Sequence, residues 1–245
     1  MFFDCNCRIG RPCVGFKQEF TDVATLTEEM RYFGIDRALV YHFLAVEYDP
    51  ATGNEQLSRE IEDREHLEAC WVLIPDHTGE MESPHRIVEQ MRAKNIKAAR
   101  MFPREHKFCI APWNAGKILS TLSRHRIPLF IDLDQIDWQE VNDLCKKWAD
   151  LPVVLTNVNS YIDRMVYPLL KEFKNLYVEI SHYSAFRGLE SICQKFGAEQ
   201  LLFGTRMPEF EAGSSKTMVA FARISQQQKD LISHKNLEAL LNGIR

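Results

Sequence analysis

The first ten residues hold closely spaced side chains that could do chemistry. Within "MFFDCNCRIG", the polar residues Asp4, Asn6 and Arg8 alternate with two cysteines, Cys5 and Cys7. A carboxylate can accept a proton or bind a metal ion, a guanidinium can bind an anion, and thiolates can bind zinc. The run therefore predicts one of two sites, a polar site on the three polar residues or a zinc clip on the cysteines.

Polar side chains also stand at the ends of most later apolar runs. These runs are short and rich in β-branched or aromatic residues, which is typical of strands. The polar residues at or just after their ends are His42, Arg100, Asp132, Asn157, Glu179, His182 and Arg206. A plain apolar core does not need so many charged and amide groups, although Arg–Asp pairs that satisfy one another inside the protein would also account for some of them.

The spacing of the apolar runs indicates which elements position these side chains. Stretches of helical periodicity separate the runs, as in 139–150, where Val141, Leu144 and Trp148 fall on one helical face. Strands that alternate with helices indicate right-handed crossovers and a parallel sheet. Eight such strands in a chain of 245 residues predict one (β/α)8 TIM barrel over residues 1–245, with C-terminal helices. The strands are expected at 1–5, 36–42, 68–75, 97–103, 127–133, 152–158, 176–181 and 201–204.

The barrel prediction assigns the two sets of residues in the first strand to opposite faces. Side chains alternate along a strand, so Cys5 and Cys7 belong to the apolar set, which is expected to face the helices. The three polar residues of the run belong to the other set, which is expected to point toward the C-terminal mouth of the barrel. Because a free cysteine behaves as a small buried hydrophobe, packing is preferred to a zinc clip that would add Cys13.

Composition and charge exclude several classes of protein. The chain has 30 Lys and Arg residues against 34 Asp and Glu, for a net charge of −4, and no basic run predicts a nucleic-acid partner. The N-terminus has no secretory signal pattern, and no apolar run approaches the ~20 residues of a membrane span. Seven scattered cysteines favour reduced thiols in a cytoplasmic protein. A homo-oligomer is compatible with these features.

Three stretches carry a resemblance to a known family. "FFDCNCRIG" resembles the first-strand motif of the amidohydrolase-2 branch of the amidohydrolase superfamily, in which an aspartate precedes two histidines at alternate positions. "AEQLLFGTRMP" resembles its last-strand motif, Phe-Gly-Ser-Asp followed by a proline. "ISQQQKDLISHKNLEALL" resembles its C-terminal helix pair, with Asn236 at the asparagine that opens the final helix. The resemblance spans the chain and implies a barrel of metal-dependent hydrolases and decarboxylases.

The same resemblance implies that the usual metal site is lost. The two first-strand histidines fall on Asn6 and Arg8, the sixth-strand histidine falls on Asn157, and the last-strand aspartate falls on Arg206. A fifth-strand histidine would fall near Asp132, and Asp4 alone keeps the identity that the family pattern has at its position. Because a guanidinium cannot donate a lone pair to a metal ion, the match predicts neither a metal nor another cofactor.

Three functional interpretations remain open, and the first is favoured. It is an enzyme, a metal-independent hydrolase that acts on a small carboxylate or phosphate at the mouth of the barrel. The branch includes metal-free lactonases of anionic substrates, although these rely on the last-strand aspartate that is missing here. The predicted substrate-binding residues are Asn6, Arg8, Arg100, Asn157 and Arg206. The predicted acids and bases are Asp4, Asp132, His42, Glu179 and His182.

The second interpretation is a non-catalytic pseudoenzyme that binds a small acid in the same pocket. The third is a metal hydrolase with an unusual ligand set drawn from Asp4, Asp132, His42 and His182. In every interpretation the guanidinium of Arg206 needs a partner, because an unpaired charge in a partly dry site costs several kcal/mol. Its predicted partner is Asp132, Asp4 or an anion from solution.

Overall fold

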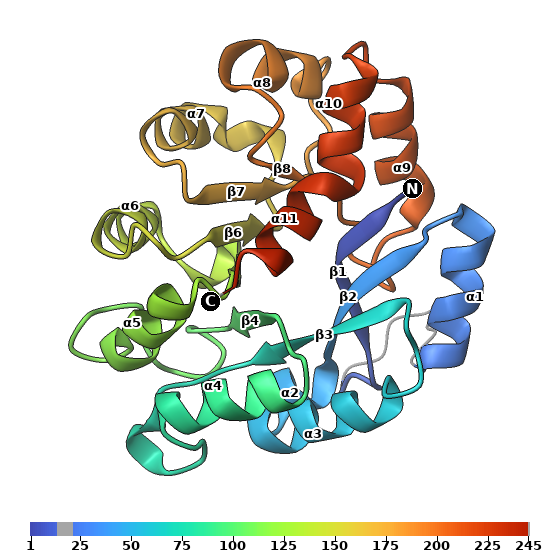
Figure 1. The fold of residues 1–245 in the computed structure, drawn as a ribbon. Helices are drawn as coiled ribbons and strands as arrows, with labels where there is room; N and C mark the ends of the chain where they lie inside the picture. The colour runs from blue at the N-terminus through green and yellow to red at the C-terminus, as the bar shows by residue number, and fades with distance from the viewer. Residues whose placement is uncertain (14–21, 245) are drawn as a thin grey trace.

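Eight parallel strands form the centre of the molecule, as Figure 1 shows. The computed structural model describes residues 1–13 and 22–244. Within these ranges the strands pair in chain order, each with the next. Their bounds are Phe3–Ile9 (β1), Arg37–His42 (β2), Leu67–Val72 (β3), Ala98–Met101 (β4), Leu129–Asp132 (β5), Val153–Thr156 (β6), Leu176–Glu179 (β7) and Leu201–Leu202 (β8).

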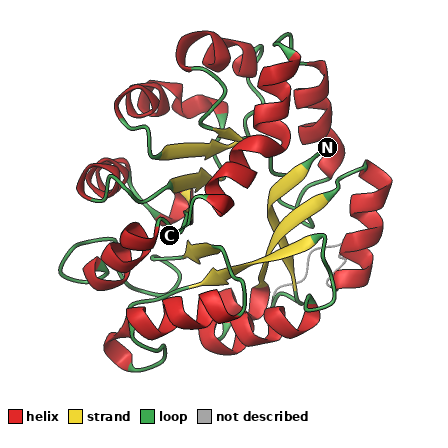
Figure 2. Ribbon diagram, in the orientation of Figure 1, coloured by secondary structure: helices red, strands yellow, loops and turns green. Residues whose placement is uncertain are grey.

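Helices surround the strands on the outside, and Figure 2 shows the regular alternation of the two. The α-helices are Val23–Phe33 (α1), Phe43–Glu47 (α2), Pro50–Glu60 (α3), Pro84–Ala93 (α4), Gly116–His125 (α5), Trp138–Lys147 (α6), Asp163–Glu172 (α7), Gly188–Phe196 (α8), Ala212–Phe221 (α9), Gln226–Asp230 (α10) and Asn236–Asn242 (α11). Short 3-10 turns lie at Asp76–Thr78, Leu133–Gln135 and Ser160–Ile162, and a π-helical turn lies at Leu231–Lys235.

The last strand returns to the first and closes the barrel. The Cys5 amide donates to the Phe203 carbonyl at 3.0 Å, and the Arg8 amide donates to the Met207 carbonyl at 3.0 Å. Each of the eight strands overlaps the apolar run that predicted it, although β1 extends to Ile9, four residues beyond its run. The prediction of a (β/α)8 barrel with C-terminal helices is confirmed.

Local capping signals fix where several helices begin. Ser225 and Gln228 form a capping box at the start of α10, as the sequence pattern indicates. Asp137 and Glu140 form another at the start of α6. The buried side chains of α6 include Val141 and Leu144, so the predicted helical face is the one that packs on the barrel.

Two apolar layers hold the barrel together. The outer layer lies between strands and helices, and the inner layer fills the barrel from its N-terminal end. Helix α11 lies across that end (Figure 1) and contributes Leu237, Leu240 and Leu241 to the inner layer. Below it, Arg37 forms ion pairs with Glu68 and, at 3.0 Å, with Glu238 of α11. This end of the barrel is therefore sealed, and the polar residues gather at the other.

A bulge in β1 corrects one expectation about the first strand. The pairing of β1 with β2 shifts between Asp4 and Cys7, so strict alternation fails there. Cys5 consequently belongs to the inner layer, and the expectation that it faces the helices is wrong. Cys7 lies in the outer layer, as predicted.

The cysteines are free thiols throughout. Both cysteines of the opening run are fully buried, and burial raises the pKa of each well above its ordinary value. Cys13 is exposed, and its backbone amide donates to Glu47. Within residues 1–13 and 22–244, no helix is long and apolar enough to cross a membrane.

Candidate functional site

The guanidinium of Arg100 is the centre of the polar layer inside the barrel. Arg100 comes from β4 and is 1% exposed. Its Nη1 donates to Asp132 Oδ1 of β5 at 2.7 Å, and its Nη2 donates to Asn6 Oδ1 of β1 at 2.9 Å. The guanidinium also lies 4.4 Å from the centre of the Tyr41 ring. Asp132 accepts a further hydrogen bond from the Thr156 hydroxyl of β6, so four strands meet at this cation–carboxylate pair.

The carboxyl group of Glu179 ends the same network on β7. Asn6 Nδ2 donates to Glu179 Oε2 at 3.0 Å, and the Ser181 hydroxyl donates to the same oxygen at 2.9 Å. Burial raises the pKa of Glu179 to about 7, although these hydrogen bonds oppose the shift. Gly204 leaves the space that this carboxyl occupies, because a Cβ at Gly204 would lie 2.5 Å from Glu179 Oε1.

Asp4 lies at the seam between β1 and the end of β8, apart from the Arg100 network. Its carboxylate accepts hydrogen bonds from the backbone N–H of Asn6 at 2.9 Å, from the backbone N–H of Thr205 at 3.1 Å and from the Thr205 hydroxyl. Burial raises the pKa of Asp4, and the hydrogen bonds from Thr205 and Asn6 oppose this. Asp4 therefore ties the first strand to the last.

Two arginines share one carboxylate at the mouth of the barrel. Glu209 Oε1 forms an ion pair with Arg8 Nη2, and Glu209 Oε2 forms an ion pair with Arg206 Nε. All three side chains are largely but not fully buried. Arg206 thus lies close to Arg8, as the strand match requires. The expectation that Arg206 pairs with a carboxylate is confirmed, but the acid is Glu209, which lies one turn along the same loop, and not Asp132 or Asp4.

Aromatic rings support both arginines. The guanidinium carbon of Arg8 lies 4.1 Å from the centre of the Phe43 ring, and its Nη1 lies 3.5 Å from the Tyr41 hydroxyl. The guanidinium carbon of Arg206 lies 5.6 Å from the centre of the Phe210 ring. Such stacking holds a guanidinium in place while its N–H groups stay in the plane that an anion can approach.

His182 stands beside this arginine pair with a defined tautomer. Its Nδ1 lies 2.8 Å from Asn157 Oδ1, which can only accept, so Nδ1 carries the proton and Nε2 the lone pair. The His182 ring packs on Phe210 at 4.7 Å between centres. Burial lowers the pKa of His182, and the positive charge of Arg206 lowers it further. The imidazole is therefore neutral at pH 7.

His42 is not part of the cluster at the mouth. It ends β2 on the outer side of the barrel, where its Nδ1 accepts from the Leu44 amide at 3.0 Å and its Nε2 lies 3.7 Å from Glu60 Oε2 of α3. Its ring also fills the space beside Gly10, where a Cβ would lie 2.4 Å away. The geometry gives His42 a role in starting α2 and packing α3, not in meeting a ligand at the mouth.

The residues at the matched positions do not fit the metal ion that the resemblance implies. A guanidinium, that of Arg100, already bridges Asp132 and Asn6, and a second, that of Arg8, lies farther along β1. Over residues 1–13 and 22–244, no three His, Cys, Asp or Glu side chains are arranged to hold a metal ion. In particular, the four residues of the unusual ligand set do not converge on one point, because each bonds to a different partner. These residues are Asp4, Asp132, His42 and His182.

Sequence reasoning missed three residues of this site. Thr156 and Thr205 each donate a hydroxyl to a buried carboxylate, but a threonine at a strand end carries no distinctive pattern. Strand β6 turns Thr156 inward, and Asn157 follows the strand with a φ of 59°. Glu209 could have been found, because an acid three residues after Arg206 is placed to pair with it in a tight turn.

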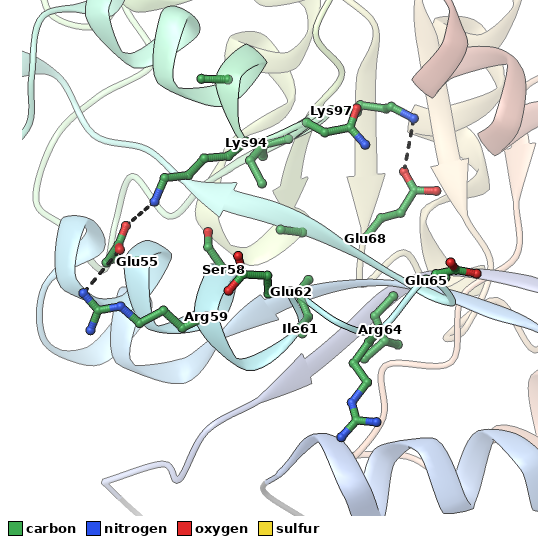
Figure 3. Close-up of a pocket in the computed structure, with 15 residues that line it drawn as sticks. Glu55, Ser58, Arg59, Ile61, Glu62, Arg64, Glu65, Glu68, Lys94 and Lys97 are labelled. Atoms are coloured by element: carbon green, nitrogen blue, oxygen red, sulfur yellow. Dashed lines mark hydrogen bonds and ion pairs between the residues drawn. The ribbon is translucent and has the colours of Figure 1, made fainter.

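A cavity lies away from this cluster, near the N-terminal ends of β3 and β4 (Figure 3). It has a volume of about 570 Å³ and is lined by charged side chains of α3, of the loop that follows α3, of β3 and of the segment between α4 and β4. Several of these charges already form pairs, including Lys94 with Glu55 and, at 3.8 Å, Lys97 with Glu68. The catalytic and binding candidates of the sequence lie at the opposite end of the strands.

Comparison with solved structures identifies the fold. The chain is similar to 5-carboxyvanillate decarboxylase from Sphingomonas paucimobilis (10% identity, 98% of each chain, TM-score 0.76) and to 2,6-dihydroxybenzoate decarboxylase complexed with 2,6-dihydroxybenzoate (12%, 98% of each chain, 0.74). It is also similar to an amidohydrolase from Burkholderia multivorans with bound HEPES (10%, 99% of each chain, 0.71). No protein-family model and no curated protein matches the sequence.

These identities are too low to carry an activity from one chain to another, but the shared architecture extends over nearly the whole length of each pair. The neighbours include both decarboxylases and amidohydrolases. The comparison agrees with the resemblance seen in the sequence at the level of fold: the chain has the same (β/α)8 barrel as these decarboxylases and amidohydrolases.

Proposed function

We propose that the protein binds a small carboxylate or phosphate compound at the C-terminal mouth of its barrel and hydrolyses it without a metal ion. The observation that carries this proposal is the arrangement of Arg8 and Arg206 on one shared carboxylate, that of Glu209. Planar guanidiniums bind carboxylate and phosphate oxygens in pairs. Glu209 balances one of the two positive charges, and the carboxyl group of Asp134 also acts on Arg206, so an anion that binds here competes with acids of the protein itself.

The groups deeper in the barrel add little negative charge at the mouth. Arg100 is matched by Asp132 at 2.7 Å, so this pair is neutral as a whole. Glu179, with its pKa raised to about 7, carries only part of a negative charge at neutral pH. An anion that approaches Arg8 and Arg206 therefore meets repulsion mainly from Glu209 and Asp134, and little from the charges deeper in the barrel.

His182 supplies the group that could activate water. Its neutral imidazole has a lone pair on Nε2, and Asn157 holds the ring in that tautomer. In a hydrolysis, Nε2 would take a proton from water as the water oxygen attacks the carbonyl or phosphoryl centre. The guanidinium of Arg206 would stabilise the oxyanion that forms, and the protonated imidazole would return the proton to the leaving oxygen or nitrogen.

Two comparisons support a carboxylate as the class of ligand. One structural neighbour holds 2,6-dihydroxybenzoate, and another is a decarboxylase of 5-carboxyvanillate. Both names describe small carboxylic acids on the same barrel fold. The arginine pair gives this chain its own means of holding such a group.

A binding protein without catalysis is the second candidate. Asp4, Asp132 and Glu179 are all buried and all accept hydrogen bonds from neighbouring side chains. Carboxylates committed in this way hold strands together and are poorly placed to move protons for a substrate. The anion site would then remain, with no reaction following.

Thermal unfolding in the presence of a panel of mono-, di- and tricarboxylates and phosphate esters tests the proposal. A ligand that binds only the folded state raises the apparent melting temperature as its concentration rises. We expect stabilisation by at least one anion class, lost in Arg8→Gln and Arg206→Gln and kept in Arg86→Gln, an exposed arginine of α4. Stabilisation that is unchanged in both mouth variants would contradict the site. Turnover of the stabilising compounds, lost in His182→Gln, then separates an enzyme from a binding protein.

A further inference from the structure

The position of Glu209 has a meaning beyond charge balance. Its two carboxylate oxygens meet two different arginines, Oε1 with Arg8 and Oε2 with Arg206. A small carboxylate ligand would use the same two oxygens against the same two guanidiniums. We infer that Glu209 is an internal substitute for the anionic ligand, which must displace its carboxylate from the arginine pair in order to bind. This inference rests on the proposed function.

Each arginine has contacts other than its ion pair with Glu209, so each can remain in place when the carboxylate leaves. Arg8 belongs to β1 and lies on the face of the Phe43 ring, 4.1 Å from its centre. Arg206 lies beside the Phe210 ring. The backbone beside Arg206 is also fixed. The backbone N–H of Arg8 donates a hydrogen bond to the carbonyl oxygen of Met207, the residue after Arg206, at 3.0 Å.

Glu209, by contrast, is carried by a turn that can release it. The turn consists of residues 206–210, follows the end of β8 and precedes α9. Its internal hydrogen bonds are short-range: the Glu209 amide donates to the Arg206 carbonyl at 3.0 Å, and the Phe210 amide donates to the same oxygen at 3.4 Å. Phe210 is 38% exposed, so the outer half of the turn is not packed into the core. Rotation of the Glu209 side chain or opening of this turn would clear the arginine pair.

The consequence is a ligand site with a built-in competitor. The apparent affinity of the anion is lowered by the fraction of molecules in which Glu209 occupies the arginines. Ligands with one weak negative charge would compete poorly, whereas a dicarboxylate or a phosphate monoester presents more charge to the two guanidiniums. Glu209 thus determines specificity by setting a threshold of charge at the mouth.

Removal of the Glu209 charge tests the inference directly. In Glu209→Gln the arginine pair has lost its internal anion, so we expect affinity for a dicarboxylate or a phosphate monoester to rise about tenfold over the wild type at pH 7.5. Glu211→Gln is the matched control, because it removes the same charge from an exposed residue two positions along the same loop. Its affinity is expected to equal that of the wild type.

The outcomes separate this inference from the proposed function. If the wild type binds the anion and Glu209→Gln binds it no more tightly, the inference is wrong and the anion site stands. If neither protein binds any anion of the panel, the proposed function is wrong and the inference falls with it. Binding by Glu209→Gln alone supports the inference that Glu209 occupies the arginine pair but contradicts the proposed function, since the wild-type protein would then bind no anion.

The rate of amide hydrogen exchange in the 206–210 turn distinguishes release of Glu209 from a general effect of the lost charge. We expect a saturating anion to speed exchange of the Glu209 and Phe210 amides in the wild type, because the turn is released when its carboxylate leaves the arginines. In ligand-free Glu209→Gln these amides should already exchange faster than in ligand-free Glu211→Gln. Exchange at this turn that is equal in all of these states would overturn the inference.

Discussion

Arg100 Nη1 lies 2.7 Å from Asp132 Oδ1, and this buried ion pair joins β4 to β5 at the level where the barrel changes from apolar to polar. The same guanidinium reaches Asn6 on β1 across the interior. The cation at the centre of the polar layer is therefore the Arg100 guanidinium. The stability expected of the protein depends in large part on this group and on the side chains bonded to it.

Replacement of Arg100 by Met is expected to destabilise the fold strongly. The variant leaves the Asp132 carboxylate buried without its cation, and breaking one partner out of a buried pair costs about 3–5 kcal/mol. Urea denaturation measures the free energy of unfolding. Arg86→Met, which removes an exposed arginine paired with Glu89 at 3.2 Å, is the control and should change it by less than about 1 kcal/mol. Equal losses in the two variants would contradict the role given to Arg100.

Stability should depend on pH through Glu179. Its pKa is raised in the folded state to about 7 from an ordinary 4.5, so its stabilising contribution is complete below pH 4.5 and is lost as the pH rises through 7. That loss is about 3 kcal/mol for a shift of this size. Glu179→Gln stays neutral, so between pH 4 and pH 8 its unfolding free energy should fall by less than that of the wild type. Parallel pH profiles for the two proteins would show that the raised pKa is wrong.

The space beside Glu179 should not tolerate a larger residue. Gly204→Ala places a Cβ 2.5 Å from Glu179 Oε1 in the closed interior, and we expect a loss of about 2 kcal/mol or more. Gly116→Ala is the matched control at the start of α5, where the nearest atom to the new Cβ is 3.9 Å away. Urea denaturation of both variants measures the unfolding free energy. A Gly204→Ala variant as stable as the wild type would mean that the Glu179 carboxyl is not packed against Gly204.

The cysteines of the first strand are expected to contribute packing alone. Changing Cys5 and Cys7 together to Ala removes two small buried groups, at a cost of about 1–3 kcal/mol of unfolding free energy. The metal content of the purified protein should be the same before and after the change. Stoichiometric zinc that disappears in the double variant would restore the zinc clip as the explanation of this run.

The strands, the helices and the barrel could be predicted from the sequence because each rests on local pattern. Eight apolar runs, amphipathic stretches between them and the capping box of Ser225 and Gln228 all act over a few residues. The bulge in β1 could not be predicted, because it depends on pairing with β2 and closure against the end of β8. The extra residue of this bulge makes the Cys5 side chain point into the barrel.

The candidate site was predicted in part. Alternation placed Arg8 at the mouth and Asp132 in the interior, since both follow from strand direction. The partners of these residues were harder to predict, because a partner is set by distance in space. The carboxylate of Glu209 reaches Arg206 within one turn, whereas Asp132 is held by Arg100. His42 pointed outward because it is the residue after Tyr41, which faces the interior.

Calorimetric titration of the best stabilising anion into the wild type and into Arg206→Gln tests the central claim most directly. Arg206 would donate charge-assisted hydrogen bonds to the ligand, each worth about 1.5–3 kcal/mol. We therefore predict one site per chain in the wild type and an affinity at least about tenfold weaker in Arg206→Gln, with Arg86→Gln unchanged. An Arg206→Gln variant that binds the same anion with wild-type affinity would contradict an anion site at the mouth of this barrel.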